Sequence, residues 1–510
     1  MQKHIVAEYI KSLKNVNELK NIIDCNEVLE KEVEYMSYDS RDIENNTLFI
    51  CKGNDFKKEY LESAVKNGVF IYVSQIDYEV GIPCILVNNI RVAHNDLAKM
   101  YYNNPSEKLN VIGITGTKGK STTAYYIRYI LDEYAKANLK NKTAIISSID
   151  TYDGVEEFES HITTPEALEL QRHFYNAKES KIENVVMEAS SQSLKYNRLD
   201  TVNFAIGVFL NISIDHISPI EHEDFEDYFA SKLKIFKQTK VACVNLDADF
   251  ADRILLKAKE DSKKVITFSV KDKQADIYAY NVHKDGFNTV FNVKTPNYSK
   301  EFVLTMPGLF NVENALAAIA VSFVLSIPEK YIYAALKIAR SSGRMEVYHT
   351  KDEKIVAIVD YAHNKLSFEK LFESSKLEYP GRKIVAIFGS AGKKAYIRRE
   401  HLGTVAGMNA DKIFLVAEDP GFEPVEQISN DIALFIKKYM QNYELIEDRG
   451  EAIKKAIEEA TSTNVKTVIL ITGKGNETRQ KYGDKYLPCT SDVEYVKMYL
   501  KEYDKIKRMV

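Results

Sequence analysis

The chain has 510 residues, of which 45% are hydrophobic and 28% are charged, and its formal net charge is −4. At roughly 150 residues per domain, this length predicts about three domains with ordinary globular cores. The weakly acidic balance argues against a general basic surface for nucleic acid or membrane, so any phosphate site must be local. The five cysteines are scattered and include no CxxC pair, which argues against a disulfide framework or a structural zinc site.

The N-terminal segment lacks the apolar core of a signal peptide, and no stretch approaches 18 continuous apolar residues. We therefore expect a cytoplasmic protein with no membrane partner and no nucleic-acid partner.

Residues 1–107 are expected to form a small α/β domain. Short apolar runs at Thr47–Cys51, Val69–Val73 and Cys84–Val87 read as strands and are separated by polar helical stretches. The turn signal at 103–106 marks a domain boundary.

Residues 108–340 are expected to form a central domain. A strand at Leu109–Ile114 is followed by a glycine-rich turn and a helical pattern from Ser121 to about Tyr134. Further buried strands are predicted at Thr143–Ser147, Asn184–Met187, Phe204–Leu210 and Val241–Asn245. This alternation predicts a largely parallel sheet covered on both faces by helices. The segment 276–304 reads as a small antiparallel insertion, and a helix is predicted from Asn311 to about Leu325.

Residues 341–510 are expected to form a C-terminal, Rossmann-like domain that begins near Arg340–Gly343. Its predicted strands are Ile355–Val359, Lys383–Phe388, Lys412–Val416 and Val465–Ile471, with helices between them. The predicted fold is therefore α/β with three domains, in which a phosphate-loop parallel-sheet domain lies in the middle.

A glycine-rich loop between the central strand and helix carries the strongest chemical signal. It consists of Gly116, Thr117, Lys118, Gly119, Lys120, Ser121 and Thr122. Glycines let backbone N–H groups approach phosphate oxygens, and the helix directs its positive end at the anion. Lys120 would place a charge on the β- and γ-phosphates, and Ser121 would ligate Mg²⁺. The strict Walker spacing fails because Ile114 stands where its first glycine would be.

This compact loop resembles the ATP loop of the Mur ligase and folylpolyglutamate synthetase superfamily. The resemblance implies an ATP-dependent ligase that activates a carboxylate as an acyl phosphate, which an amine then attacks. It implies ATP and Mg²⁺ as cofactors, and cations around the transferred phosphoryl group.

The segment Thr163-Thr164-Pro165-Glu166 resembles a loop of the Mur ligases that add the third residue of the cell-wall precursor peptide. There it contacts the UDP-muramoyl-dipeptide. From chemistry alone, these hydroxyls serve equally well as caps of the following helix. In the same resemblance, Ser190, Gln192 and Arg198 also contact this acceptor.

Four residues are assigned by the resemblance to the catalytic and metal site. Glu188 ends a buried strand and would bind Mg²⁺. His216, in Asn-Ile-Ser-Ile-Asp-His, would serve a second metal. Lys232 matches a lysine that is carbamylated, which converts an ammonium into a carboxylate-like metal ligand. Lys120 completes the set; without the resemblance, His216 reads as structural and Lys232 as a surface lysine.

The nucleotide site would be completed by residues from later segments. Asn311 and Asn314 lie on an Ala-rich helix and would sit near the adenine, although they also suit a simple helix start. Arg344 and Asp360, from the start of the C-terminal domain, would close over ATP and exclude water.

The first domain resembles the uridine-diphosphate site of these ligases around 37–41 and 49–53, with Ser40 as its contact residue. Lys52, Lys57 and Lys58 either meet the diphosphate or form a solvated face.

The C-terminal domain should bind the incoming amino acid. The predicted contacts are Arg399, Glu418, Asp419, Pro420, Gly421, Gly473 and Glu477. Diaminopimelate-adding relatives carry Asp-Asn-Pro-Arg where this chain has Glu-Asp-Pro-Gly, so the arginine that suits a second carboxylate is missing. An acidic segment suits an ammonium, which favours L-lysine; L-ornithine satisfies the same argument. Asn476 replaces the family's usual histidine.

Taken together, the resemblance implies a monomeric ligase that joins L-lysine to the D-Glu of UDP-N-acetylmuramoyl-L-Ala-D-Glu during peptidoglycan precursor synthesis. The alternatives are the same ligase with meso-diaminopimelate or L-ornithine, a folylpolyglutamate synthetase-like ligase, and a non-catalytic nucleotide-binding protein of the same fold.

Overall fold

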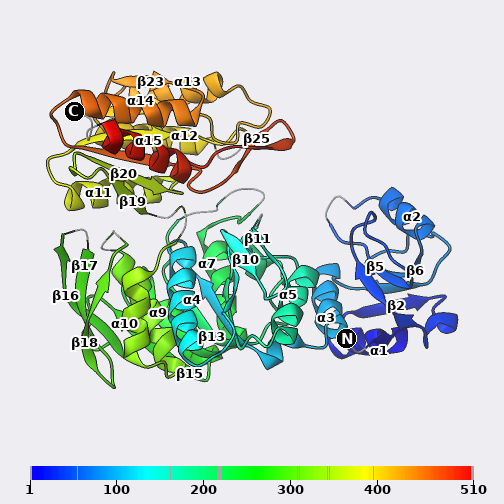
Figure 1. Ribbon diagram of the computed structural model, residues 1–510. Coiled ribbons are helices and arrows are strands. Elements are labelled where there is room, and N and C mark those ends of the chain that lie inside the picture. The colour runs from blue at the N-terminus through cyan, green and yellow to red at the C-terminus, as the bar shows by residue number, and fades with distance from the viewer. Residues whose placement is uncertain are drawn as a thin grey trace. The chain divides into compact units, whose positions relative to one another are not determined.

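The computed structural model describes residues 3–53, 56–160, 162–214, 217, 221–286, 288–306, 308, 310–341, 343, 345–393 and 396–506. The chain divides into two compact units (Figure 1). The first unit consists of Met1–Tyr280, Asn292–Phe302 and Glu313–Leu336. The second unit consists of Asn281–Phe291, Val303–Val312 and Lys337–Val510. Among the described residues, none of the helices combines the length and apolar character needed to cross a bilayer.

The N-terminal part is built on a sheet of order β2-β7-β6-β5-β4. Its strands are β2 (Leu19–Ile23), β4 (Tyr35–Ser37), β5 (Thr47–Ile50), β6 (Val69–Ser74) and β7 (Cys84–Val87). A short pair, β1 (His4–Ile5) with β3 (Glu32–Val33), and the helices α1 (Val6–Asn15), α2 (Lys58–Lys66) and α3 (Ile90–Tyr101) complete it. The three predicted strands are confirmed. The short outer strands β2 and β4 were missed, and β2 is mostly exposed, so it lacks a buried-strand pattern.

The central sheet has the order β11-β10-β9-β12-β8-β13-β14-β15-β16-β17-β18. Its strands are β8 (Asn110–Thr115), β9 (Ala144–Ile146), β10 (Asp150–Tyr152), β11 (Glu157–Glu159), β12 (Asn184–Glu188), β13 (Phe204–Phe209), β14 (Thr239–Asn245), β15 (Lys264–Ser269), β16 (Ile277–Asp285), β17 (Asn288–Lys294) and β18 (Ser299–Leu304). The run from β9 to β16 is parallel, as predicted. The segment 276–304, expected to be a small antiparallel insertion, supplies β16, β17 and β18, which extend this sheet at one end.

Helices cover both faces of the central sheet and bury the apolar side chains that its inner strands direct to each side. They are α4 (Lys120–Ala137), α5 (Ala167–Glu179), α6 (Ser191–Lys195), α7 (Phe225–Leu233), α8 (Ala251–Asp261), α9 (Asn311–Val324) and α10 (Glu329–Ile338). Val111 packs in one core with Phe174 of α5 and Phe229 of α7. The next residue, Ile112, faces the other side and is also fully buried, while α4 packs against β8 and β12.

The C-terminal sheet has the order β19-β20-β24-β21-β22-β23 and is parallel apart from β19. Its strands are β19 (Glu346–His349), β20 (Ile355–Asp360), β21 (Lys383–Phe388), β22 (Lys412–Leu415), β23 (Tyr443–Leu445) and β24 (Thr467–Thr472). The helices are α11 (Lys365–Glu378), α12 (Ile397–Asn409), α13 (Val425–Ile436), α14 (Arg449–Ser462) and α15 (Asp492–Ile506), and β25 (Arg479–Tyr482) pairs with β26 (Lys485–Pro488). The three main sheets confirm the predicted α/β fold class, whereas the boundaries at 107 and 340 stay predictions.

A buried ion pair fixes the loops at the carboxyl ends of β22 and β24. Arg449 donates two hydrogen bonds to the Asp492 carboxylate, at 2.8 and 2.6 Å, and two more to the carbonyl oxygens of Thr472 and Ala417. Both partners are almost fully buried, so each charge depends on the other for compensation.

We expect Asp492→Asn to lower the free energy of unfolding of the second unit by about 3 kcal/mol or more, because it leaves a guanidinium buried and uncompensated. Denaturant unfolding measures this. Glu226→Gln, which removes the exposed partner of Arg253, is the control and should change nothing measurable. Equal unfolding curves for Asp492→Asn and wild type would contradict the role of this pair.

Candidate functional site

The phosphate loop lies between β8 and α4, as the sequence predicts. Gly119 precedes the helix with φ 83°, and a Cβ there would lie 2.3 Å from the Asn314 side-chain oxygen, so only glycine fits. Asn211 holds the loop from β13: its side chain accepts from Lys118 N at 2.9 Å and donates to Lys118 O at 3.1 Å. The loop backbone is thus fixed, with the α4 N-terminus directed at whatever occupies it.

Two lysine side chains converge on this loop. The Lys120 ammonium donates to the carbonyl oxygens of Gly116 and Thr117, at 2.9 and 3.3 Å. The Lys232 ammonium, from α7, donates to the same Gly116 oxygen at 3.0 Å. Lys232 is only 2% exposed and lies over the Tyr228 ring, so its side chain belongs to this site and not to the surface.

Two of the four predicted metal ligands, Ser121 and Glu188, are brought together through a third residue. Ser121 lies 3.1 Å from the Ser148 hydroxyl, and Ser148 donates from both its backbone N–H and its hydroxyl to the Glu188 carboxylate, at 2.9 and 3.2 Å. Glu188 is 1% exposed. A hard cation takes such oxygens as ligands, so this donor set fits Mg²⁺. His216 lies outside the described residues. Ser148 was missed because no motif marks it.

The loop carrying Thr163 and Thr164 lies against the end of β12. The Thr164 hydroxyl donates to Glu188 O at 2.8 Å and accepts from Ser190 N at 3.2 Å, while the Ser190 hydroxyl caps α6. Thr164 thus ties this loop to the end of β12 and does not cap α5. Arg198 donates to Thr164 O at 3.3 Å. Gln192 donates to Glu221 at 3.3 Å.

A cavity of about 620 Å³ in the N-terminal part contains Ser40. Its lining residues are Tyr38, Asp39, Ser40, Arg41, Lys52, Gly53, Phe56 and Tyr60. Of the three lysines considered for a diphosphate, Lys52 lines this cavity, whereas Lys57 and Lys58 are exposed and do not line it. This favours the solvated-face interpretation for Lys57 and Lys58.

The remaining predicted nucleotide residues are described in part. Asn314 contacts the loop as above and accepts from Thr123 at 3.4 Å. Asn311 is fully buried at the start of α9. Asp360, at the end of β20, accepts from Met345 N at 2.8 Å. Arg344 lies outside the described residues.

In the C-terminal domain, Arg399 is already engaged by carboxylates. Its guanidinium forms a two-hydrogen-bond pair with Glu423, at 2.8 and 2.7 Å, and a further bond to Asp431 at 2.7 Å. It is 3% exposed. Arg399 therefore anchors the segment that follows Gly421, and its predicted contact with the amino acid stays a prediction.

The acidic side chains of the predicted acidic segment differ in their surroundings and in their ionic partners. Lys474, which the sequence marked only as part of a motif, lies 3.0 Å from Asp419 and 2.5 Å from Glu477. Glu418 stands at the end of β22, and the Gly473 Cα lies so close that a Cβ there would be 2.2 Å from its carboxylate oxygen. Desolvation raises the pKa of Glu418 to about 7, partly offset by Arg449. A cation added beside Glu418 would favour its ionised carboxylate. Pro420 and Gly421 continue the loop, and Gly421 has φ 59°.

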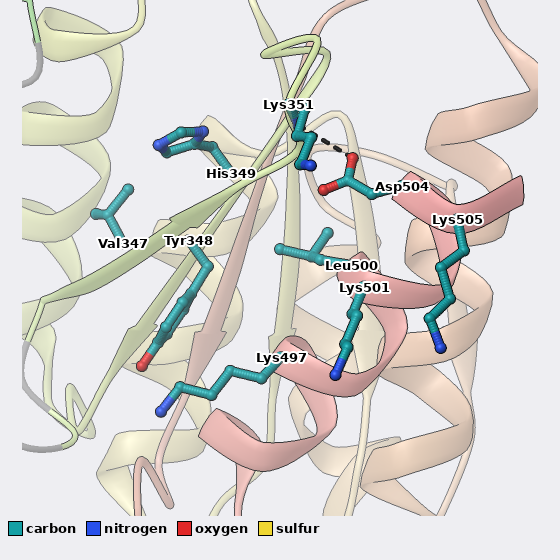
Figure 2. Close-up of a pocket in the computed structure, with 9 residues that line it drawn as sticks. All are labelled: Val347, Tyr348, His349, Lys351, Lys497, Leu500, Lys501, Asp504 and Lys505. Carbon is teal, nitrogen blue, oxygen red and sulfur yellow. Dashed lines mark hydrogen bonds between the residues drawn. The ribbon is translucent and has the colours of Figure 1, made fainter. Parts of the chain in front are cut away.

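Another hollow in the second unit, of about 510 Å³, lies between β19 and α15 (Figure 2). It contains none of the predicted site residues. Its lining includes Lys351, Lys497, Lys501 and Lys505.

Glu418 predicts a pH dependence of stability. Because its pKa is raised on folding, its contribution is fully present below the ordinary glutamate pKa and is lost as pH rises through about 7. We expect the free energy of unfolding of Glu418→Gln, minus that of wild type, to be larger at pH 8 than at pH 4.5. Urea unfolding at both pH values measures this, and a constant difference would contradict it.

Comparisons with known proteins identify the family. Residues 114–322 match the Mur ligase middle domain, and residues 343–475 match the Mur ligase glutamate ligase domain. The chain is 36% identical to the UDP-N-acetylmuramoyl-L-alanyl-D-glutamate–L-lysine ligase of Enterococcus faecalis, over 92% of each chain. It is 34% identical to the corresponding 2,6-diaminopimelate ligase of Clostridioides difficile, over 91% of this chain and 94% of that one.

Solved structures show the same fold. A UDP-N-acetylmuramoyl-L-alanyl-D-glutamate–2,6-diaminopimelate ligase has a TM-score of 0.67 at 23% identity and covers 98% of this chain and 99% of its own. The MurF ligase of Thermotoga maritima in complex with ADP has a TM-score of 0.61 at 16% identity, with 93% and 98% covered. With relatives more than 30% identical over nine-tenths of its length, the chain belongs to the Mur ligase family.

Proposed function

We propose that this protein is an ATP-dependent ligase that joins L-lysine to the D-Glu γ-carboxylate of UDP-N-acetylmuramoyl-L-Ala-D-Glu. The observation that carries the proposal is the convergence of Lys120 and Lys232 on the phosphate loop beside the buried Glu188. This arrangement suits transfer of a phosphoryl group to a carboxylate, where charge stabilisation and positioning supply most of the catalysis.

In the proposed reaction, an oxygen of the D-Glu carboxylate attacks the γ-phosphorus of ATP, and ADP leaves. The lysine amine then attacks the acyl carbon, an amide forms, and inorganic phosphate leaves with the former carboxylate oxygen. Lys120 and the loop N–H groups would hold the phosphates. Ser121 and Glu188 would hold Mg²⁺, which supplies positive charge to the phosphoryl oxygens.

The choice of lysine rests on the C-terminal domain and on the relatives. Gly421 stands where diaminopimelate-adding members have an arginine, and Glu418, three residues earlier, is partly exposed and has a raised pKa. An ammonium placed beside Glu418 would favour the ionised carboxylate and gain a charge-assisted hydrogen bond. Relatives from Enterococcus faecalis and Streptococcus agalactiae carry the lysine ligase name. A monomeric state and a cytoplasmic location stay expectations.

The test is phosphate release from ATP and Mg²⁺ with UDP-N-acetylmuramoyl-L-Ala-D-Glu, with L-lysine, meso-diaminopimelate and L-ornithine offered separately. Release that depends on both the acceptor and lysine is the expected result. Release with diaminopimelate in place of lysine would overturn the specificity, and acceptor-independent release would overturn the ligase activity.

Lys120→Ala should lower kcat by at least about a hundredfold while leaving the thermal midpoint unchanged, because it removes a cation from the predicted phosphate loop. Lys136→Ala, at the exposed opposite end of α4, is the matched control and should behave as wild type. Near-normal turnover by Lys120→Ala would rule out the loop as the site of phosphoryl transfer.

Lys232→Ala should likewise be nearly inactive, and short carboxylates such as acetate should partly restore its turnover. The proposal takes Lys232 to carry a carbamate, which forms from its amine and CO₂ with loss of a proton, and a free carboxylate can occupy the place of that group. The control is Lys237→Ala, which removes an exposed lysine shortly after Lys232 in the sequence. If Lys232→Ala has a wild-type rate, Lys232 has no part in the mechanism.

A further inference from the structure

Glu166 joins two cations that come from distant parts of the first unit. One carboxylate oxygen lies 2.6 Å from the Arg198 guanidinium, and the other lies 2.5 Å from the Lys52 ammonium. Lys52 follows β5 of the N-terminal sheet, whereas Arg198 follows α6 of the central part. All three side chains are about one-fifth exposed, so the contacts are partly shielded from water.

Helix capping does not explain the placement of the Glu166 carboxylate. Glu166 is the residue before α5, yet its side chain makes no capping hydrogen bond. The Thr164 hydroxyl, not Glu166, ties this loop to β12. A residue chosen only to begin the helix would need neither the charge nor the length of glutamate.

The two cations are placed where an acceptor would need them. Lys52 lines the 620 Å³ cavity and lies 4.5 Å from the centre of the Tyr38 ring. Arg198 also donates to Thr164 O, so it reaches the loop next to Glu188. The Glu166 carboxylate therefore pairs with one cation that lines the cavity and with another that contacts the loop next to Glu188.

Charged side chains of both signs surround this contact. Lys52 and Arg198 bring two positive charges, Glu166 brings one negative charge, and the Glu169 carboxylate accepts a hydrogen bond from the hydroxyl of Tyr38, whose ring Lys52 faces. His94 makes an edge contact with the same ring; desolvation and the two cations lower its pKa to about 3, so it adds no charge at neutral pH. Its Nε2 is buried and has no partner within the described part of the chain, so one polar atom here remains for a ligand.

We propose that Glu166 is a positioning residue for the acceptor: it holds Lys52 and Arg198 together so that both cations meet the acceptor's anionic groups from fixed positions. This inference rests on the proposed function, because it takes UDP-N-acetylmuramoyl-L-Ala-D-Glu as the ligand. Without the carboxylate the two cations repel each other and must be ordered when the acceptor binds. We therefore expect the loss of the Glu166 carboxylate to weaken acceptor binding and to leave the rate of the chemical step unchanged.

The test compares Glu166→Gln and Glu166→Asp with Glu444→Gln. Glu444 is a matched control because its carboxylate also bridges two cations, Lys412 at 2.6 Å and Lys455 at 2.5 Å, in the other unit and at no predicted site. We expect Glu166→Gln to raise the KM for the acceptor about tenfold, the loss of one charge-assisted hydrogen bond. Its kcat and its KM for ATP and lysine should stay within about threefold of wild type.

Glu166→Asp keeps the charge and should recover part of the acceptor KM, and Glu444→Gln should match wild type throughout. Calorimetric titration of the acceptor without ATP should give the same order of affinities. An unchanged acceptor KM in Glu166→Gln, or a joint loss of all three KM values and of the thermal midpoint, would overturn the positioning role. A wild-type enzyme that neither binds nor turns over the acceptor would overturn the proposed function as well.

Discussion

The carbonyl oxygen of Gly116 accepts hydrogen bonds from the ammonium groups of both Lys120 and Lys232, and the candidate site is arranged around that point. Two like charges at one oxygen repel each other unless an anion lies close by. The parallel sheet makes the meeting possible, because β8, β12 and β13 end side by side and deliver the loop, Glu188 and Asn211 to one edge. The fold thus concentrates positive charge locally in a chain whose net charge is −4.

In the proposed reaction, each ligand meets a different set of charged groups of the protein. Phosphates meet Lys120 and the α4 N-terminus, the acceptor meets Lys52 and Arg198, and the amine meets Glu418. Several of these charges are held by internal partners, as with Lys474 between Asp419 and Glu477. These internal partners keep the charged side chains ordered in partly buried surroundings, so that the side chains can hold a ligand in a fixed position.

The sequence predicted the inner strands well because buried parallel strands are short apolar runs between helices, as at Cys84–Val87 and Lys383–Phe388. It missed β2 and β11, whose residues are mostly exposed, since periodicity marks burial and not pairing. It also missed the inner parallel strand β15. The loop residues were found through glycine spacing. Ser148 and the pairing of Glu166 were not, because bonds between distant segments leave no local pattern. Arg399 was expected to be open to a ligand, but its link to Glu423 depends on tertiary packing.

The central claim is that a carboxylate of the acceptor is phosphorylated at this loop. The most direct measurement uses acceptor labelled with ¹⁸O in the D-Glu γ-carboxylate, together with ATP, Mg²⁺ and L-lysine, and determines the label in the released phosphate by mass spectrometry. The account predicts one ¹⁸O atom in each phosphate released, because the carboxylate oxygen leaves with the phosphoryl group. Phosphate without label would mean that water, not the acceptor, receives the phosphoryl group, and would contradict the account.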